Sequence, residues 1–281
     1  MKVIDTIAEL RRELDSHRAA GSTVGFVPTM GYLHDGHASL VRSAAEDNEV
    51  VLVSIFVNPL QFAEGEDLDD YPRDLERDRA LVVEAGATHL LCPSVEEMYP
   101  RPMATFVEVE GVSAGFESMT RPTHFRGVST VVTKLFAMVG PCRAYFGEKD
   151  FQQLAIVTRL AADLSLPVDV VGCPTRREVD GLAMSSRNVY LDPEQRAQAP
   201  VLRRALEAGA AHVEAGATSA EAVVETMTRV AAEASLAELD YAACVMADDL
   251  TEPEGPPVGG LRLLIAARFG NTRLIDNIAA G

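Results

Sequence analysis

An almost continuous apolar run is the feature of this sequence that most restricts its fold. Residues Val50–Val57 read VVLVSIFV, and only Ser54 interrupts the apolar side chains. A strand that is covered on one face alternates apolar and polar residues, whereas a parallel strand covered by helices on both faces is apolar throughout. The run therefore predicts a central strand in a parallel sheet with helices on both sides.

Helical and strand patterns alternate on either side of this run. The expected strands are Thr23–Val27, Thr88–Cys92, Ala144–Phe146 and Val168–Cys173, and the expected helices are His37–Glu46, Pro72–Ala85, Val128–Val139 and Asp150–Leu164. Strands that alternate with helices pair in parallel through right-handed crossover connections. The first part of the chain is therefore predicted to be a Rossmann-like α/β domain.

The pattern changes after about Thr175. Two Ala- and Glu-rich helices are expected at Pro193–Ala215 and Ser219–Ala234, followed by strands at Leu239–Met246 and Leu261–Phe269. This order of elements predicts a smaller α+β unit. We therefore expect two domains, a Rossmann-like parallel-sheet domain over residues 1–175 and a smaller α+β domain over residues 176–281.

The charge of the chain limits the partners that it is expected to bind. The 281 residues carry a formal net charge of −17, which opposes binding to nucleic acid and to anionic membrane surfaces. No apolar stretch approaches the length of about 20 residues that spans a bilayer, and no signal-peptide pattern is seen. The four cysteines are scattered and predict neither a disulfide framework nor a metal knuckle. We predict a cytoplasmic protein with no nucleic-acid or membrane partner.

The tetrapeptide HDGH, residues 34–37, stands where the loop after the first expected strand meets the first helix. A helix N-terminus presents backbone N–H groups and a positive dipole end, and both favour a phosphate. Gly36 allows a ligand to approach the backbone, and two imidazoles can donate hydrogen bonds to phosphate oxygens. Two capping histidines or two zinc ligands remain alternative interpretations at this point.

Two later segments carry the same kind of chemistry. The residues GEKD, 147–150, follow a predicted strand and open a helix, and MSSRN, 184–188, lies just past the proposed domain boundary. In isolation the first is an ordinary turn with a helix cap and the second a polar linker. Together with HDGH they are typical of the HxGH nucleotidyltransferase superfamily, whose members act at the α-phosphate of ATP. The glycine loop of P-loop enzymes is missing from the sequence.

A closer resemblance extends over most of residues 23–191. The segments that carry it, in order, are PTMGYLHDGH (28–37), FVNPLQF (56–62), YPR (71–73), RPTHFRGV (121–128), FGEKDFQQL (146–154) and REVDGLAMSSRN (177–188). In these segments the sequence resembles the pantothenate synthetase (pantoate–β-alanine ligase) family. The match weakens in the last 90 or so residues, as expected of a part that mainly closes the site and builds a dimer.

The resemblance implies a two-step, ATP-dependent ligase. Pantoate and ATP would form an enzyme-bound pantoyl adenylate and pyrophosphate, and the amine of β-alanine would then release pantothenate and AMP. The first domain would bind ATP and pantoate, the second would close the site, Mg²⁺ would bridge the phosphates, and the chain would be a homodimer.

The resemblance also implies which residues contact the nucleotide. His37 matches the position assigned as the catalytic acid. The residues expected to act with it on the transition state are His34, Lys149, Ser185, Ser186 and Arg187. The full set expected to bind ATP is Met30, Gly31, Tyr32, Leu33, His34, Asp35, Gly36, His37, Gly147, Glu148, Lys149, Asp150, Arg176, Met184, Ser185, Ser186 and Arg187. Arg176 stands where the family usually has an apolar residue.

Amides and one carboxylate complete the implied site. Gln61 and Gln153 match the family's pantoate-binding amides, and Asn58 accompanies them. Neutral amides can orient a carboxylate without an ion pair that would weaken it as a nucleophile; without the family match, ordinary core or surface amides would be the better interpretation. Asp78 matches a carboxylate near the metal. Its neighbour Arg77 offers no ligand, so the predicted metal site rests on Asp78, waters and phosphates.

Three other functions remain to be distinguished from this ligase. An adenylyltransferase would share the HDGH loop but would leave AMP on its product, so analysis of the products separates the two. An RNA-binding remnant of a synthetase is disfavoured by the charge of −17. A degenerate ATP-binding sensor is disfavoured by the two intact histidines and Lys149.

Overall fold

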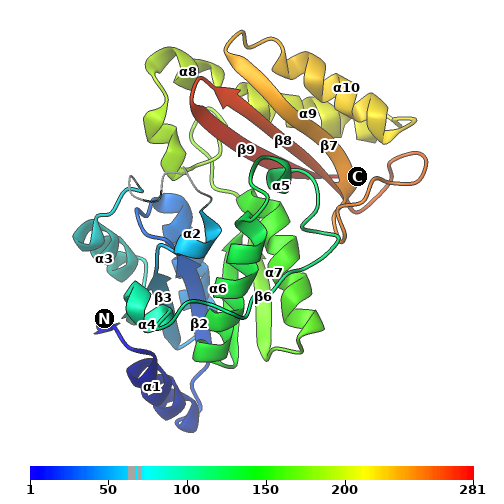
Figure 1. The fold of residues 1–281 in the computed structure, drawn as a ribbon. Coiled ribbons are helices and arrows are strands. Elements are labelled where there is room, and N and C mark those ends of the chain that lie inside the picture. The colour runs from blue at the N-terminus through cyan, green and yellow to red at the C-terminus, as the bar shows by residue number, and fades with distance from the viewer. Residues whose placement is uncertain (63–67, 69–70) are drawn as a thin grey trace. The chain divides into compact units, whose positions relative to one another are not determined.

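The computed structural model describes residues 1–62, 68 and 71–281, and these fall into two compact units (Figure 1). Unit 1 contains Met1–Gly147 and Ile156–Pro174, and unit 2 contains Glu148–Ala155 and Thr175–Gly281. The chain therefore enters unit 2 briefly, returns to unit 1, and leaves it again. The predicted division of the chain into domains at residue 175 remains a prediction.

Unit 1 is built on a parallel sheet. Within the described residues the strand order is β1-β4-β3-β2-β5-β6, and every neighbouring pair is parallel. The strands are β1 (Lys2–Ile4), β2 (Val24–Thr29), β3 (Val50–Ile55), β4 (His89–Leu91), β5 (Cys142–Gly147) and β6 (Val168–Cys173). Together with the separate antiparallel sheet of unit 2, this arrangement confirms the predicted fold class.

Helices cover both faces of the sheet, as the apolar run of β3 requires. Val51 and Val53 pack with residues of α2 and α3, including Val41 and Val82. Leu52 points to the opposite face, because successive side chains of a strand alternate, and it is also fully buried. The helices are α1 (Ile7–Ala19), α2 (Asp35–Asp47), α3 (Leu75–Glu84), α4 (Val95–Met98), α5 (Glu117–Thr120), α6 (His124–Val139) and α7 (Phe151–Asp163).

The direction in which successive strands are added to the sheet changes between β2 and β5, while the strands themselves stay parallel. From β2 the chain builds the sheet toward β3 and β4, whereas β5 pairs with the other edge of β2 and is followed by β6. In open parallel sheets ligands bind at such a point, beyond the carboxyl ends of the strands. β2 ends at Thr29, so the residues between Thr29 and α2 lie at this edge.

Unit 2 pairs a small antiparallel sheet with helices. The described strands β7 (Ala237–Met246), β8 (Leu261–Phe269) and β9 (Thr272–Ala280) follow one another in the sheet. Helices α9 (Val201–Glu214) and α10 (Ala220–Ala231) lie on one face of this sheet, and α8 (Pro193–Gln198) precedes them (Figure 1). Leu206, Met227 and Leu263 meet in the core between the helices and the sheet.

The single helix expected over Pro193–Ala215 is wrong. The structure has α8 and α9 instead, with the break at Ala199 and Pro200. Pro200 lacks the backbone N–H that a continuous helix would need, and its ring clashes with the preceding turn. Pro200 therefore ends one helix and starts the next.

Five of the described strands and α-helices have no counterpart among the predicted ones: β1, α1, α4, α5 and β9. β1 has three residues, too few for a pattern. On α1 only Leu10 and Leu14 are buried, so its apolar stripe is narrow. β9 contains Asp276 and Asn277, residue types that are depleted in strands, and pairing with β8 outweighs that preference.

Neither a membrane span nor a disulfide marks the described part of the chain. None of its helices is both long and apolar enough to cross a membrane. All four cysteines are free thiols. Burial raises the pKa of Cys92 to about 11 and that of Cys142 to about 12, so neither is a thiolate at neutral pH.

Candidate functional site

The loop between β2 and α2 is held in an uncommon backbone conformation. Gly31 has φ 89° and Tyr32 has φ 50°, the left-handed region that residues with a Cβ rarely adopt. Asp78 of α3 holds this turn: its Oδ2 accepts the N–H of Tyr32 at 2.7 Å and its Oδ1 accepts the N–H of Leu33 at 2.7 Å. The guanidinium of Arg77 lies over the Tyr32 ring, 4.9 Å from its centre. Helix α3 therefore fixes the loop at two successive peptide groups.

Asp78 is a buried carboxylate with an altered acidity. It is 1% exposed, and this burial raises its pKa, while the bonds from Leu33 and Tyr32 act in the opposite direction. Both oxygens already accept a backbone N–H. These contacts fit a residue that positions the loop, and the predicted role near a metal remains a prediction.

Helix α2 begins with a reciprocal cap made by its two histidines. The N–H of Gly36 donates to Nδ1 of the N-cap residue His34 at 3.1 Å, and the N–H of His34 donates to Nδ1 of His37 at 3.3 Å. A capping box satisfies two backbone donors that the helix itself cannot. Because each Nδ1 is an acceptor, each neutral ring carries its hydrogen on Nε2. Capping and phosphate binding are therefore compatible. The cap uses Nδ1 of each ring as an acceptor, and this sets the tautomer in which Nε2–H can donate to a phosphate oxygen.

The two imidazoles lie together at the positive end of α2. Their centres are 4.1 Å apart. A helix N-terminus with two Nε2–H donors favours an anion with several oxygens. Among the described residues, the group of three potential metal ligands includes neither His34 nor His37. The geometry therefore favours phosphate over zinc at this loop.

Asn58 has all of its hydrogen-bonding capacity in use within unit 1. Its Nδ2 donates to Gln61 Oε1 and to the carbonyl oxygen of Gly127, each at 3.2 Å. Its Oδ1 accepts the N–H of Leu60 at 3.3 Å and the hydroxyl of Tyr99 at 2.8 Å. An amide has two donor hydrogens and two acceptor lone pairs, so this set is complete. These contacts fit a residue that orients Gln61.

Gln61 is brought next to the loop between β2 and α2. It ends the short 3₁₀ turn Pro59–Gln61 and is 7% exposed. Its Nε2 lies 2.7 Å from Sδ of Met30, the first residue of the predicted ATP-binding set. A Cβ on Gly127 of α6 would lie 2.2 Å from the carbonyl oxygen of Leu60, so a glycine is needed for α6 to approach this turn. The structure thus joins segments 28–37, 56–62 and 121–128.

Within unit 2, strands β8 and β9 anchor the segment Glu148–Asp150. Nδ2 of Asn277 donates to the carbonyl oxygens of Glu148 at 2.9 Å and Lys149 at 2.8 Å. Nη2 of Arg262 pairs with Glu148 Oε2 at 2.9 Å, and its guanidinium lies 4.1 Å from the centre of the Phe151 ring. The main chain of Lys149 is therefore fixed, while its ammonium is 3.5 Å from Asp150 Oδ1.

The segment before the serine pair forms a small hairpin. The N–H of Met184 donates to the carbonyl oxygen of Arg176 at 2.9 Å, and Arg177 bridges to Ala183. Ser185 then caps the 3₁₀ turn Ser186–Tyr190 by accepting the N–H of Arg187 at 3.3 Å. Ser185 and Arg187 are therefore held by the backbone geometry of one tight turn.

Two adjacent residues of β9 connect these motifs, and sequence reasoning missed them. Asp276 is 4% exposed and accepts two hydrogen bonds from Arg177, at 2.6 Å and 2.9 Å. Its neighbour Asn277 holds Glu148 and Lys149. The signal was a polar pair flanked by the apolar residues Leu274, Ile275 and Ile278. Gln153 lies in the first turn of α7 and is half-buried, and its role remains a prediction.

Comparison with known protein families shows to which family the chain belongs. A family model described as pantoate-beta-alanine ligase matches residues 2–279. The chain belongs to the pantoate-beta-alanine ligase family. A protein of this family from Thermus thermophilus, named pantothenate synthetase, is 53% identical over 283 residues, which cover 99% of each chain. One from Sinorhizobium medicae with the same name is 51% identical over 278 residues, covering 99% of this chain and 95% of the relative.

Solved structures of the family agree with the fold. A crystal structure of pantothenate synthetase from Thermus thermophilus matches with a TM-score of 0.92 at 52% identity, covering 99% of both chains. A ligase of the family from Francisella tularensis, described as complexed with beta-gamma ATP and beta-alanine, matches with a TM-score of 0.80 at 31% identity over 99% of this chain and 97% of that one. The chain therefore matches enzymes of this family over nearly the whole of their length.

Proposed function

We propose that this enzyme condenses (R)-pantoate with β-alanine to pantothenate through a pantoyl adenylate, releasing AMP and pyrophosphate. The observation that carries the proposal is the cap of α2, in which Nδ1 of each histidine accepts a backbone N–H and so leaves the ring hydrogen on Nε2. The family match over residues 2–279 supports the choice of substrates. The relative from Francisella tularensis, whose described ligands are beta-gamma ATP and beta-alanine, supports it further.

In the first step a carboxylate oxygen of pantoate attacks the α-phosphorus of ATP, and pyrophosphate leaves with the electrons of the broken P–O bond. Negative charge grows on the phosphoryl oxygens as this happens. We expect the N-terminus of α2 and the Nε2–H groups of His34 and His37 to stabilise that charge. Asp78 contributes by holding the loop that leads into the helix.

Pantoate is proposed to be oriented by amides. Gln61 is held by Asn58 beside Met30, so its amide is ordered before substrate binds. Preorganised groups cost less to order when the substrate arrives. Gln153 is proposed as the second amide because of the family resemblance.

The second unit is proposed to supply further cations and hydroxyls for the phosphates: Lys149, Ser185, Ser186 and Arg187. Their support is the pair Asp276 and Asn277: Asn277 fixes the main chain of Glu148 and Lys149, and Asp276 holds the side chain of Arg177 in the segment that leads to the serine pair. In the second step the amine of β-alanine attacks the acyl carbon, the C–O bond to AMP breaks, and the amine loses a proton.

Magnesium is expected with ATP, but the contacts of Asp78 do not fit a direct ligand. Both of its oxygens accept backbone N–H groups, and its side chain is 1% exposed. Mg²⁺ prefers several waters together with phosphate oxygens. We therefore propose that the phosphates and waters hold the metal.

Isotope transfer tests the proposed route. With ¹⁸O in the carboxylate of pantoate, we expect label in AMP and none in pyrophosphate, because the attacking oxygen stays on the phosphorus when the amide forms. Mass spectrometry of the products after turnover with ATP, Mg²⁺ and β-alanine measures this. Label in inorganic phosphate together with ADP would show an acyl-phosphate route, and AMP retained on the product would show an adenylyltransferase.

Replacing Gln61 tests the pantoate site. We expect Gln61→Ala to lower kcat/KM for pantoate by about 5- to 150-fold, because hydrogen bonds worth about 1–3 kcal/mol are lost. ATP affinity should hardly change, and Gln153→Ala should behave alike. Steady-state kinetics with each substrate varied provides the measurement. Lower ATP affinity with unchanged use of pantoate would contradict the assignment.

The family resemblance also suggests a homodimer. Sedimentation at micromolar concentration should show a species of twice the chain mass of 30.2 kDa. A species of the single-chain mass across that range would refute the prediction.

A further inference from the structure

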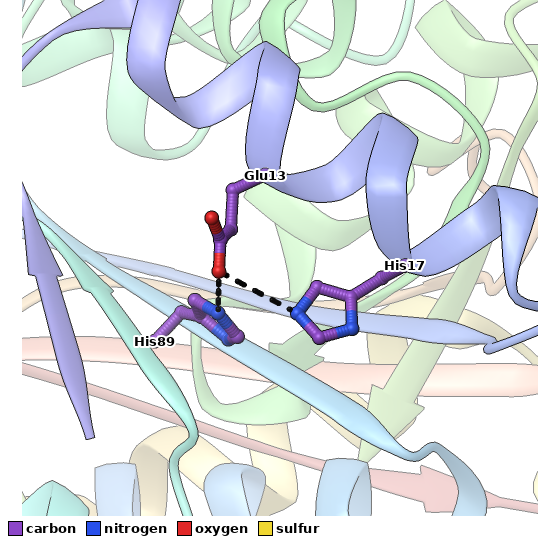
Figure 2. A group of neighbouring side chains, drawn as sticks. All are labelled: Glu13, His17 and His89. Atoms are coloured by element: carbon purple, nitrogen blue, oxygen red, sulfur yellow. Dashed lines mark hydrogen bonds and ion pairs between the residues drawn. The ribbon is translucent and has the colours of Figure 1, made fainter.

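A second group of chemically active side chains lies in unit 1, and the ligase mechanism does not use it. It consists of Glu13, His17 and His89 (Figure 2). Glu13 and His17 are four residues apart on α1, so they share one face of the helix. His89 begins β4, whereas the HDGH loop follows the end of β2. The carboxyl ends of all the parallel strands lie at one end of the sheet. The group therefore lies toward the other end, where the strands begin.

The three ligand atoms are close together. Glu13 Oε1 is 3.4 Å from Nε2 of His89 and 3.7 Å from Nε2 of His17, and all three atoms lie within 4.8 Å of one another (Figure 2). Ligands about 2.0–2.1 Å from a tetrahedral zinc ion are about 3.4 Å from each other. Two of the three separations are therefore already near this value. The His17 ring is about one-third exposed and can turn to close the third.

The donor set is selective for a class of metal. Two imidazole nitrogens and one carboxylate oxygen make a site that suits zinc and related transition metals, with a fourth position for water. Calcium and magnesium prefer oxygen ligands alone. The spacing and the atoms together therefore indicate a divalent transition-metal ion.

A hydroxyl behind His89 fits the same interpretation. Nδ1 of His89 is 2.8 Å from Thr88 Oγ1, which also lies 3.1 Å from the carbonyl oxygen of Val51. When the hydroxyl hydrogen points to Val51, Nδ1–H donates to Thr88 and Nε2 presents a lone pair to Glu13. A metal-bound histidine requires this tautomer, and such partners orient it.

One neighbouring charge opposes a cation here. Nζ of Lys2 is 2.6 Å from Glu13 Oε2, and Lys2 is the register partner of His89 in the sheet. The ammonium occupies one carboxylate oxygen and leaves Oε1 to the histidines. Its charge repels a dication, so its removal should strengthen metal binding.

We propose that Glu13, His17 and His89 bind a divalent transition-metal ion, with zinc as the best match, and that this ion ties α1 to β4. The site is structural rather than part of the ligase chemistry. A bound ion joins residues that are distant in the sequence, so it should stabilise the folded chain.

Zinc binding to the whole chain, freed of metal by a chelator and kept without ATP and magnesium, tests the proposal. Calorimetry should show one Zn²⁺ per chain, and saturation should raise Tm by at least about 4 °C. His17→Gln should weaken binding by more than about 100-fold, since loss of an outer partner alone costs about 10- to 100-fold. His212→Gln is the matched control, because His212 lies in unit 2 and contacts Thr226, and it should bind zinc like the wild type.

A second variant separates a metal site from a simple network of hydrogen bonds and ion pairs. Lys2→Gln should tighten zinc binding by at least about threefold, because it removes the opposing charge. If the three side chains form only a network of hydrogen bonds and ion pairs, the Tm should not depend on zinc. Zinc affinity unchanged by His17→Gln, no rise in Tm with zinc, or no tightening in Lys2→Gln would each overturn the proposal.

Discussion

Replacing His37 with alanine should lower pantoate-dependent ATP–pyrophosphate exchange by roughly 10²-fold or more. The reason is that His37 lies in the first turn of α2, and its Nδ1 accepts the N–H of His34, which leaves the hydrogen on Nε2. That donor is lost in the variant, and the charge on the α-phosphoryl group loses its stabilisation. Exchange kinetics at saturating ATP and pantoate measure the effect.

The control for His37 is a glutamine at the same position. Glutamine at the third position of a helix can complete a capping box, so His37→Gln should restore the cap and the thermal stability. It supplies no imidazole, and exchange should stay at least about tenfold below the wild-type rate. Full recovery of exchange in His37→Gln would show that His37 serves as a cap and not as a catalytic residue.

Replacing Asp78 with alanine should affect both stability and catalysis. The N–H groups of Tyr32 and Leu33 lose their acceptor, and an unsatisfied buried donor costs about 1–3 kcal/mol. We therefore expect the free energy of unfolding to fall by about 2–4 kcal/mol, partly offset because a buried charge is removed. Exchange should fall by about 10²-fold, because Tyr32 is held at φ 50° by these bonds. Urea unfolding and exchange kinetics provide the measurements.

Asp74 offers a matched control on the same helix. Its side chain accepts the N–H of Arg77 as the N-cap of α3. Asp74→Ala should cost about 0.5–2 kcal/mol in stability and leave the exchange rate near that of the wild type. An equal loss of exchange in both variants would mean that helix stability, rather than the loop, is responsible.

The pH dependence of Asp78 has a defined sign. Burial raises its pKa above the ordinary value of 3.8, so the folded chain binds this proton more tightly than the unfolded chain. The corresponding stability is present below pH 3.8 and is lost as the pH rises through the folded pKa. Asp78→Asn should remove this part of the pH profile.

Local patterns predicted much of unit 1. The apolar run at residues 50–57 indicated a strand covered on both faces. In the structure every residue of β3 before Ile55 is buried. The reason is that a central parallel strand is shielded from water on both sides. The strand Val168–Cys173 was predicted with its observed bounds. The family was also within reach of the sequence, because segments such as HDGH and GEKD combine several unusual residues in a fixed order.

Contacts between distant segments could be found only in the tertiary structure. No local pattern shows that Asp78 would bond the peptide groups of Tyr32 and Leu33, or that Asn58 would orient Gln61. The same holds for β9. Its polar pair, Asp276 and Asn277, disfavours a strand in the sequence, but in the structure β9 pairs with β8 and Asp276 is bonded by Arg177. The sequence by itself determined the family and predicted which residues carry the chemistry, because reactivity belongs to side-chain type and motif. The tertiary structure decided which residues hold them in place, because hydrogen bonds depend on distance in space and not on separation along the chain.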